Sequence, residues 1–181
     1  MLKNKTALSL SPLALLTLAA CGGSNSTVSA VSGKVQKGPL ENALVYLDYD
    51  RDGVFDPTDS AQVVTSSTGA YSIVPTSSVY NLVALSTAAT IDTSSGTAVG
   101  LGVKLEAPAG STVVTPMTTM VQSLITADEA LATPLGVTAD TAKEDIALAM
   151  GFTAAQISAG FDPLTYDAFS ATPDAALDLQ V

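Results

Sequence analysis

The sequence predicts a mainly β protein with a smaller α part, in which an antiparallel β-sandwich comes first and a small helical region follows. Two observations predict this order. Up to about residue 107, short β-branched runs are separated by Gly, Pro, Asn and Asp, whereas after Pro108 the apolar residues recur at helical spacing. We therefore assign residues 30–107 to the sandwich and residues 113–181 to the helical region.

Six segments of the first part are short β-branched runs of the kind that form β-strands. In the clearest of them, Ala43, Val45 and Leu47 share one face, and the residues between them share the other. Short strands separated by turn-forming residues at this spacing are typical of a sandwich. We expect strands near 30–36, 43–48, 61–66, 70–74, 80–86 and 100–106.

Four helices are expected in the second part, from apolar stripes, a proline at a first helical position, capping residues and terminal glycines. We place them at about 116–125, 142–150, 153–160 and 172–181. The last pattern is still open at Val181, so we expect the natural protein to be longer and this helical region to be truncated.

Residues 1–20 have the features of a bacterial export signal. Two lysines near the start precede an apolar stretch that is too short to span a bilayer, and small residues follow. The sequence Leu18-Ala19-Ala20-Cys21 resembles a lipobox, which implies cleavage before Cys21 and a lipid on its sulfur. Several acyl chains on one residue anchor a protein stably.

The lipobox implies a location as well. Residues 21–29, rich in Gly and Ser, would form a flexible tether between the lipid and the fold. Gly22 stands where an Asp would retain a lipoprotein at the inner membrane, so the chain resembles the class sorted to the outer membrane. We expect a lipid-anchored protein of the cell envelope, at the outer membrane or the cell surface.

Composition excludes several kinds of chemistry. The chain has no His and no Trp, and Cys21 is its one cysteine, which leaves no Ser-His-Asp or Cys-His catalysis and no disulfide. The net charge is −10, and removal of Lys3 and Lys5 with the signal would make it −12. Such a surface repels nucleic acid. We expect neither an enzyme nor a nucleic-acid partner.

Residues 48–59 carry the pattern of an EF-hand calcium loop, with Gly53 at the sixth position. Alternate residues of a tight loop can turn their oxygens inward, and calcium takes six to eight hard oxygen ligands. The twelfth position is Asp where Glu is usual, and a strand rather than a helix precedes the loop. The predicted ligands are Asp48, Asp50, Asp52, Asp56 and Asp59 through their carboxylates and Val54 through its carbonyl.

The alternative for this loop is an acidic, solvated hairpin, since Asp and Gly are common in turns. Four aspartates within nine residues repel one another unless a cation lies between them, which favours calcium. The other acidic pairs, Asp128-Glu129 and Glu144-Asp145, point to different faces of a helix. We interpret them as solvated or helix-end charges.

Several motifs together resemble prealbumin-like modules, also described as carboxypeptidase-regulatory-like, Cna-B-like or SdrD-B-like. Val31-Ser32-Gly33-Lys34-Val35 resembles their opening, and Gly38 to Asp48 resembles the next strand, after which calcium-loop members carry the acidic loop. Thr65 to Tyr71 resembles their T-x-x-x-G-x-Y turn. The resemblance covers about residues 30–107 and implies an immunoglobulin-like or prealbumin-like sandwich that serves as a stalk, spacer or adhesion platform.

Three functions follow as expectations. The first is a calcium-stabilised structural or adhesion lipoprotein, with the membrane and an extracellular protein or glycan as partners. The second is the accessory N-terminal region of a longer secreted enzyme, such as a polysaccharide hydrolase. The third is a small envelope binding protein, which predicts a pocket between the sandwich and the helices.

Overall fold

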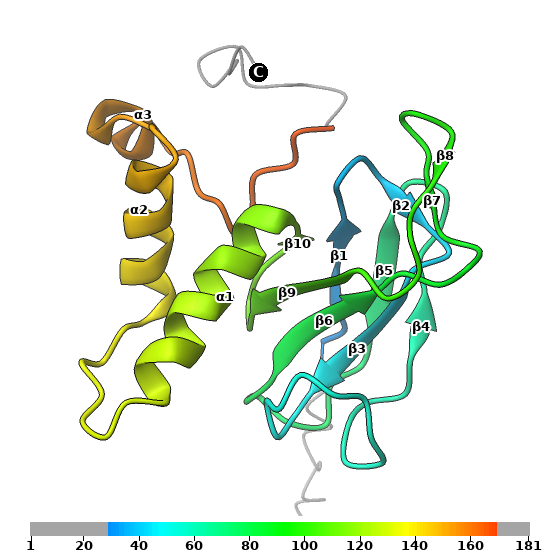
Figure 1. Cartoon of the computed structure of the whole chain (residues 1–181), viewed down its shortest axis with the longest axis horizontal. Coiled ribbons are helices and arrows are strands. Elements are labelled where there is room, and N and C mark those ends of the chain that lie inside the picture. The colour runs from blue at the N-terminus through cyan, green and yellow to red at the C-terminus, as the bar shows by residue number, and fades with distance from the viewer. Residues whose placement is uncertain (1–28, 170–181) are drawn as a thin grey trace, which may run out of the picture.

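The computed structural model describes residues 29–169, which form a β-sandwich and a helical unit beside it (Figure 1). The strands are β1 (Val31–Val35), β2 (Leu40–Glu41), β3 (Leu44–Asp48), β4 (Val63–Val64), β5 (Ala70–Ile73), β6 (Asn81–Leu85), β7 (Ile91–Asp92), β8 (Thr97–Ala98), β9 (Lys104–Pro108) and β10 (Val113–Val114). The helices are α1 (Pro116–Glu129), α2 (Ala139–Ala149) and α3 (Ala154–Ser158). This order confirms the predicted class, a mainly β fold followed by a small helical region.

Two sheets form the body of the sandwich. One is antiparallel throughout, in the order β4-β3-β6-β9, and the other has the order β10-β1-β5. A third, small sheet of β2, β7 and β8 extends from one end (Figure 1). The core contains Val35, Tyr71, Ile73 and Val114 from one main sheet and Val45, Leu47, Leu82, Ala84, Leu105 and Ala107 from the other.

The predicted faces of the strand at 43–48 are confirmed. Val45 and Leu47 lie in the core, so Tyr46 lies on the outer face of the same sheet. The register places Tyr46 in one row with Val83 of β6 and Glu106 of β9, while Asp48 is paired with Asn81. Polar groups therefore collect on this outer face, near the end of β3.

Five of the six predicted strands correspond to observed ones, but the prediction for 100–106 is wrong in its first half. Gly102 has a φ of +81° and Leu101 is 78% exposed, so residues 100–103 form a turn. The strand β9 begins only at Lys104. Gly and apolar residues alternate over this segment as they would in a strand. The hydrophobic period does not reveal that a glycine adopts a positive φ and so interrupts the extended conformation.

The strand β10 was not expected from the sequence. Val113 and Val114 are buried and pair in parallel with Lys34 and Val35 of β1, although we had placed them with the helical region. The remaining unpredicted strands, β2, β7 and β8, are two residues long. A two-residue strand shows no period, so these strands depend on the contacts around them.

Helices α1 and α3 begin where the sequence predicts, whereas α2 begins at Ala139, three residues before the predicted start. Pro116 lies in the first turn of α1, and a capping box opens each helix, with Thr115, Thr138 and Thr153 as the N-caps. The apolar stripe of α1 faces away from the sandwich: Val121 and Ile125 pack with Ala142 of α2 and Leu164. A stacked pair, Phe152 and Phe161, closes the packing around α3.

Helix α1 covers the open edge of the main sheet (Figure 1). The Glu106 N–H donates to Thr119 Oγ1 at 2.9 Å, and Thr118 Oγ1 donates to the Glu106 carbonyl at 2.8 Å. An unpaired edge strand invites association with other chains, and these two threonines satisfy it from within. Thr119 lies on the side of α1 opposite Val121, whereas Thr118 is buried at the border of the apolar stripe, so one helix serves two interfaces.

The segment after α3 returns to the sandwich. The N–H of Thr112, just before β10, donates to the Leu164 carbonyl at 2.9 Å. Asp167 accepts hydrogen bonds from the side chains of Lys34 and Gln36 on β1. The helical unit is therefore attached to the sandwich at its beginning, through α1, and again near residue 165.

Asp128 at the end of α1 corrects the interpretation of the Asp128-Glu129 pair. It is 6% exposed, and its carboxylate accepts the N–H groups of Leu135, Gly136 and Val137 at 2.7, 2.9 and 2.8 Å. Asp128 is thus a buried acceptor that shapes the connection between α1 and α2. The three donors follow it by seven to nine residues, which is beyond the reach of helical spacing.

Within residues 29–169, no helix has the length and apolar character needed to cross a membrane. The predicted signal at 1–20, Cys21, nearly all of the predicted tether at 21–29 and the predicted helix after Thr172 lie outside the described residues.

Candidate metal site in the loop after β3

The predicted calcium loop connects β3 to β4 and lies over the outer face of the main sheet. The ring of Phe55 meets Tyr46 edge-on, with 5.2 Å between the ring centroids. At the start of the loop, the Tyr49 hydroxyl accepts the N–H of Thr76 at 2.8 Å. An aromatic contact and a hydrogen bond to a distant segment therefore hold the loop against the sandwich.

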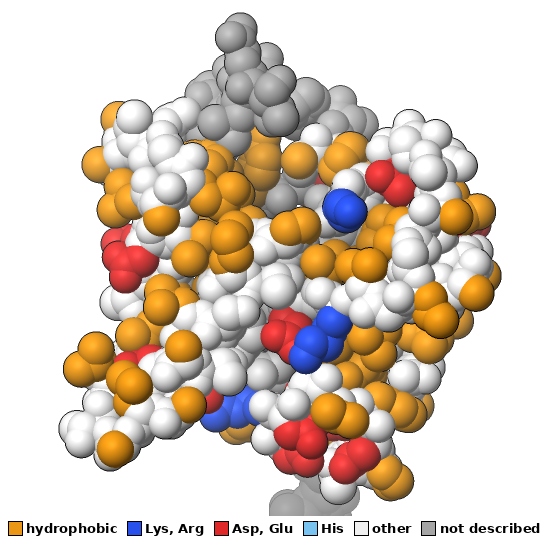
Figure 2. Space-filling model, viewed as in Figure 1, with side chains coloured by type: hydrophobic (Ala, Val, Ile, Leu, Met, Phe, Trp, Pro, Cys, Tyr) orange, Lys and Arg blue, Asp and Glu red, His pale blue; other side chains and the backbone are white. Residues whose placement is uncertain are grey.

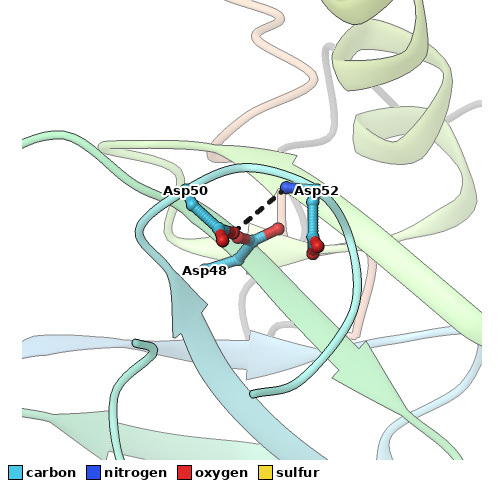
Figure 3. A group of neighbouring side chains, drawn as sticks. All are labelled: Asp48, Asp50 and Asp52. Carbon is cyan, nitrogen blue, oxygen red and sulfur yellow. Dashed lines mark hydrogen bonds between the residues drawn. The ribbon is translucent and has the colours of Figure 1, made fainter. Parts of the chain in front are cut away.

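Three of the six predicted ligands converge. Asp48, Asp50 and Asp52 each offer one carboxylate oxygen, and these oxygens all lie within 4.8 Å of one another (Figure 3). Asp48 is the last residue of β3 and is fully buried, whereas Asp50 and Asp52 are exposed. This cluster could hold a metal ion between the end of the strand and the solvent.

Backbone groups of the loop fix the Asp48 carboxylate. Its Oδ1 accepts the N–H of Arg51 at 2.6 Å, and its Oδ2 accepts the N–H of Gly53 at 2.8 Å. The loop turns sharply to present these donors, with φ of +63° at Arg51 and +75° at Gly53. Each carboxylate oxygen retains a lone pair after these bonds. Asp48 can therefore keep its backbone partners and still bind a cation.

The other two aspartates make local turns. Asp50 Oδ1 accepts the N–H of Asp52 at 3.4 Å, and Asp52 Oδ1 accepts the N–H of Val54 at 2.7 Å. Each bond spans two residues, so the chain turns in equal steps from Asp50 to Val54. The steps repeat the two-residue spacing of the ligand pattern, which explains why local sequence brings these carboxylates together.

The remaining predicted ligands lie outside this cluster. Asp56 Oδ1 accepts both the N–H and the hydroxyl of Thr58 at 2.6 Å, and the same hydroxyl lies 3.4 Å from Asp50 Oδ2. Asp59 accepts the N–H of Tyr49 and that of Asp56. The side chain of Val54 is 62% exposed. In this arrangement Asp56 and Asp59 close the second half of the loop.

The electrostatics of Asp48 favour a cation. Burial is the largest cause that raises the pKa of its carboxyl above the ordinary value, and neighbouring Asp50 and Asp59 raise the pKa further. The N–H groups of Gly53 and Arg51 act in the opposite direction without offsetting burial. A buried carboxylate beside like charges is costly to ionise, and a bound cation would remove that cost.

Tyr46, beneath the loop, belongs to the same electrostatic environment. Burial raises the pKa of its hydroxyl, and the charges of Asp48 and Asp59 raise the pKa further. Its oxygen is buried and has no hydrogen-bond partner among the described residues. By contrast, the two bonds from Thr58 lower the pKa of Asp56 below its ordinary value. Negative charge is therefore balanced least well at the Asp48 end of the loop.

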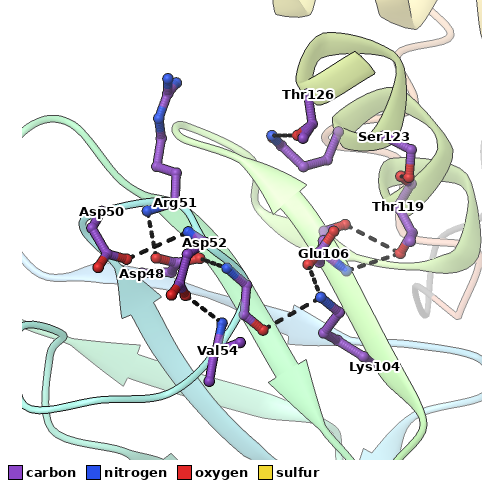
Figure 4. A network of polar contacts seen from close by, with 12 residues as sticks. Asp48, Asp50, Arg51, Asp52, Val54, Lys104, Glu106, Thr119, Ser123 and Thr126 are labelled. Atoms are coloured by element: carbon purple, nitrogen blue, oxygen red, sulfur yellow. Dashed lines mark hydrogen bonds and ion pairs between the residues drawn. The ribbon is translucent and has the colours of Figure 1, made fainter. Parts of the chain in front are cut away.

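A polar groove separates the loop from α1 (Figure 4). Its volume is about 370 Å³, and Arg51, Lys104 and Glu106 line it together with Asn81, Ser123 and Thr126. A pocket between the sandwich and the helices was expected if the chain is a small envelope binding protein, but these lining residues were not identified from the sequence. They come from strands and a helix far apart in the chain, and no local pattern connects them.

Two ion pairs lie in this groove. Arg51 Nη2 is 3.0 Å from Glu129 Oε1, so one side chain joins the loop to the last residue of α1. Lys104 Nζ is 2.7 Å from Glu106 Oε1 and donates to the Gly53 carbonyl at 3.4 Å (Figure 4). In Figure 2, acidic side chains gather at the lower end of this face, where Figure 1 shows the loop after β3.

Comparisons with protein-family models, with curated proteins and with solved structures find no match to this chain. The resemblance to prealbumin-like modules stays a prediction that rests on the quoted motifs.

Proposed function

We propose that the chain is a calcium-stabilised structural or adhesion module, anchored by lipid at the surface of a bacterial cell envelope. The observation that carries the calcium part is the convergence of Asp48, Asp50 and Asp52 on a buried strand end. The sandwich has no catalytic role in this proposal. It acts as a rigid spacer that presents the parts farther along the chain to an extracellular protein or glycan.

The donor chemistry supports calcium over other common metals. All candidate ligands are hard oxygens, and the chain lacks the His and the clustered Cys that zinc or copper sites use. Magnesium demands near-ideal octahedral geometry at about 2.0–2.1 Å, whereas calcium accepts six to eight irregular ligands. Two exposed carboxylates on a turning loop suit the ion that tolerates irregular geometry.

Calcium at this position would stiffen the connection between β3 and β4. It would neutralise Asp48 at the end of a core strand, whose next neighbour in the sheet is Asn81 of β6. Binding to the folded state alone stabilises it by about 2.7 kcal/mol when calcium is at a hundredfold excess over Kd. That is a large part of the stability of a small domain.

The test of the ion site is a calcium titration of the protein alongside Asp48→Ala/Asp52→Ala. Calorimetry and thermal melting are read together. We expect saturable binding that raises Tm in the parent protein and is lost in the variant. A matched control, Glu144→Ala/Asp145→Ala, removes the same charge from α2 and should keep the response. Absence of heat and of a Tm shift at millimolar calcium would make the loop a solvated turn.

The test of the anchor is separate. A labelled fatty acid fed to cells that express the chain should be incorporated into it, and Cys21→Ser should abolish the incorporation. Protease added to intact cells would then report whether the sandwich lies at the outer surface. A label that persists in Cys21→Ser would contradict lipidation at this residue.

A further inference from the structure

The chain enters the described part of the structure at one end of the sandwich, which we call the entry end (Figure 1). Val31, the first residue of β1, pairs with Ile73, the last residue of β5. Asp48, the last residue of β3, pairs with Asn81, the first residue of β6. The loop after β3 and the connection from β5 to β6 therefore both lie at the entry end.

The helical unit reaches the same end. Arg51 in the loop after β3 is 3.0 Å from Glu129, the last residue of α1, so the connection from α1 to α2 starts beside that loop. Figure 1 shows this connection and the loop after β3 along the same lower edge of the molecule. Three loops, two from the sandwich and one from the helical unit, thus form the entry end.

Each of these loops carries exposed apolar side chains. They are Val54 and Phe55 after β3, Val74 and Val79 between β5 and β6, and Leu131 and Leu135 between α1 and α2. A hollow of about 580 Å³ opens at the same end, with Val31, Pro75 and Tyr80 in its wall, and no residue that lines it is charged. The entry end therefore offers an apolar surface to its surroundings.

The predicted lipid lies close to this surface along the chain. Cys21 precedes Ser29 by eight residues, and eight residues span at most about 29 Å when fully extended. A lipid on Cys21 would keep the entry end within that distance of the bilayer. A tether of this length gives the surface a high effective concentration at the membrane, so that even a weak apolar contact is populated.

We infer that the entry end docks on the bilayer that holds the lipid, with the exposed apolar side chains of its three loops among the lipid head groups. The inference rests on the proposed lipid anchor and adds an orientation to it. The strength of such interfacial contact follows the apolar area that is buried. Asp167 is held by Lys34 and Gln36 beyond the middle of β1, so the last described residues lie on the side away from the membrane.

Charge selects the kind of lipid. The loops of the entry end also carry Asp50, Asp52 and Glu129, and their one basic residue, Arg51, is paired with Glu129. Anionic lipids give a bilayer a negative surface potential that repels such a surface. The partner is therefore a zwitterionic bilayer without net charge, of phosphatidylcholine or phosphatidylethanolamine.

The test uses tryptophan as a reporter, because the chain contains none. Leu135→Trp and Val79→Trp place it at the entry end. Leu101→Trp is the matched control: Leu135 and Leu101 are 82% and 78% exposed, and Leu101 precedes β9, whose first residue pairs with the far end of β6. The full-length chain, lipidated in cells, is reconstituted in phosphatidylcholine vesicles whose brominated acyl chains quench tryptophan on contact. We expect quenching and a blue-shifted emission at positions 79 and 135, and neither at 101.

A second set of variants tests the surface itself. Val74→Ser/Leu131→Ser should remove most of the quenching of the reporter at position 135, because apolar contact area is lost. Val64→Ser/Leu148→Ser makes the same changes at exposed positions outside the three loops and should preserve the quenching. Phosphatidylglycerol added to the vesicles should reduce the quenching at low salt, and added salt should restore it.

The outcomes separate the docking from the anchor. If the chain floats with the vesicles but positions 79 and 135 are quenched no more than 101, the docking is overturned and the anchor stands. A blue shift without quenching would overturn it too, since another protein chain, such as a second copy, then covers the entry end. Stronger quenching with phosphatidylglycerol would overturn the choice of a neutral bilayer. If the chain does not float with the vesicles, the anchor fails and this inference fails with it.

Discussion

Two buried carboxylates, one at the end of β3 and one near the end of α1, are held in different ways. Asp48 ends β3 and accepts two backbone N–H groups; Asp128 lies near the end of α1 and accepts three. Bonds from Val137 and its neighbours lower the pKa of Asp128, whereas burial and nearby aspartates raise the pKa of Asp48.

The difference shows what backbone donors can and cannot do. Three N–H groups with no other acid bonded to them are sufficient to hold the charge of Asp128. Two N–H groups are insufficient for Asp48, because its burial outweighs them and other carboxylates lie beside it. Acidification should therefore remove the unfavourable charge of Asp48, and it should weaken the hydrogen bonds that Asp128 accepts. The first carboxylate lies in a cluster that could hold a cation, whereas the charge of the second is held by groups of the protein.

The largest expected effect comes from Asp48→Ala. The substitution removes a ligand, and it also leaves the N–H groups of Arg51 and Gly53 without their acceptor, at a cost of roughly 1–3 kcal/mol. The calcium response should disappear and the calcium-free Tm should fall. Thermal melting with and without calcium measures both. A calcium response of full size in this variant would remove Asp48 from the site.

Asp128→Ala should show the complementary behaviour. The N–H groups of Leu135, Gly136 and Val137 lose their acceptor, so the connection between α1 and α2 should loosen. Hydrogen exchange should accelerate at residues 131–138, and Tm should fall. Calcium should still bind, because no predicted ligand has changed. Loss of calcium binding would show that the two carboxylates are not independent.

Two glycines extend the comparison to the backbone. Gly53 and Gly136 have φ of +75° and +80°, so alanine at either position should cost about 1–2 kcal/mol from the left-handed conformation alone. A Cβ at Gly53 would also lie 2.6 Å from Lys104 Nζ, whereas one at Gly136 would meet nothing within 4 Å.

Gly53→Ala should therefore weaken calcium binding as well as lower Tm, because Lys104 must move and the N–H that holds Asp48 is displaced. Gly136→Ala should lower Tm and leave calcium affinity unchanged. Calorimetry and melting on both variants measure the contrast. Equal losses of calcium affinity would contradict the local origin of the effect.

How far the sequence predicted these sites depends on how far apart their residues lie. The aspartates at 48, 50 and 52 were predicted together because they lie within five residues, and hydrogen bonds that span two to five residues fold this segment. Asp128 was interpreted as a solvated or helix-end charge, and its role as a buried acceptor was missed, since its donors lie seven to nine residues away in a connection without a pattern. Arg51 and Glu129 are 78 positions apart and meet only because α1 packs along β9.

The fold shows the same limit. The longer strands were predicted from short β-branched runs between turn residues, and the helices from apolar stripes and end signals. The strand β10 was assigned to the wrong part because Val113 and Val114 are two valines beside a proline-led helix. Only their parallel partners on β1 make them a strand. Local rules therefore predict the elements, and long-range contacts decide which sheet a short element joins.

The smallest effect expected is a pH dependence that isolates Asp128. Because the folded state lowers its pKa, its stabilising contribution is complete above the unfolded value of about 3.9 and is lost as pH falls through the folded value. Asp128→Asn carries no such charge. The difference in Tm between the parent chain and Asp128→Asn should be constant near neutral pH and narrow below about pH 4.

The melts are made without calcium, so that Asp48 and its neighbours titrate alike in both proteins and cancel in the difference. Acid that protonates Asp128 leaves it with one strong acceptor oxygen, as in Asn, and three N–H groups then compete for it. The two proteins should converge for that reason. A difference that stayed constant down to pH 2.5 would mean that the shape of the side chain, and not its charge, holds the connection between α1 and α2.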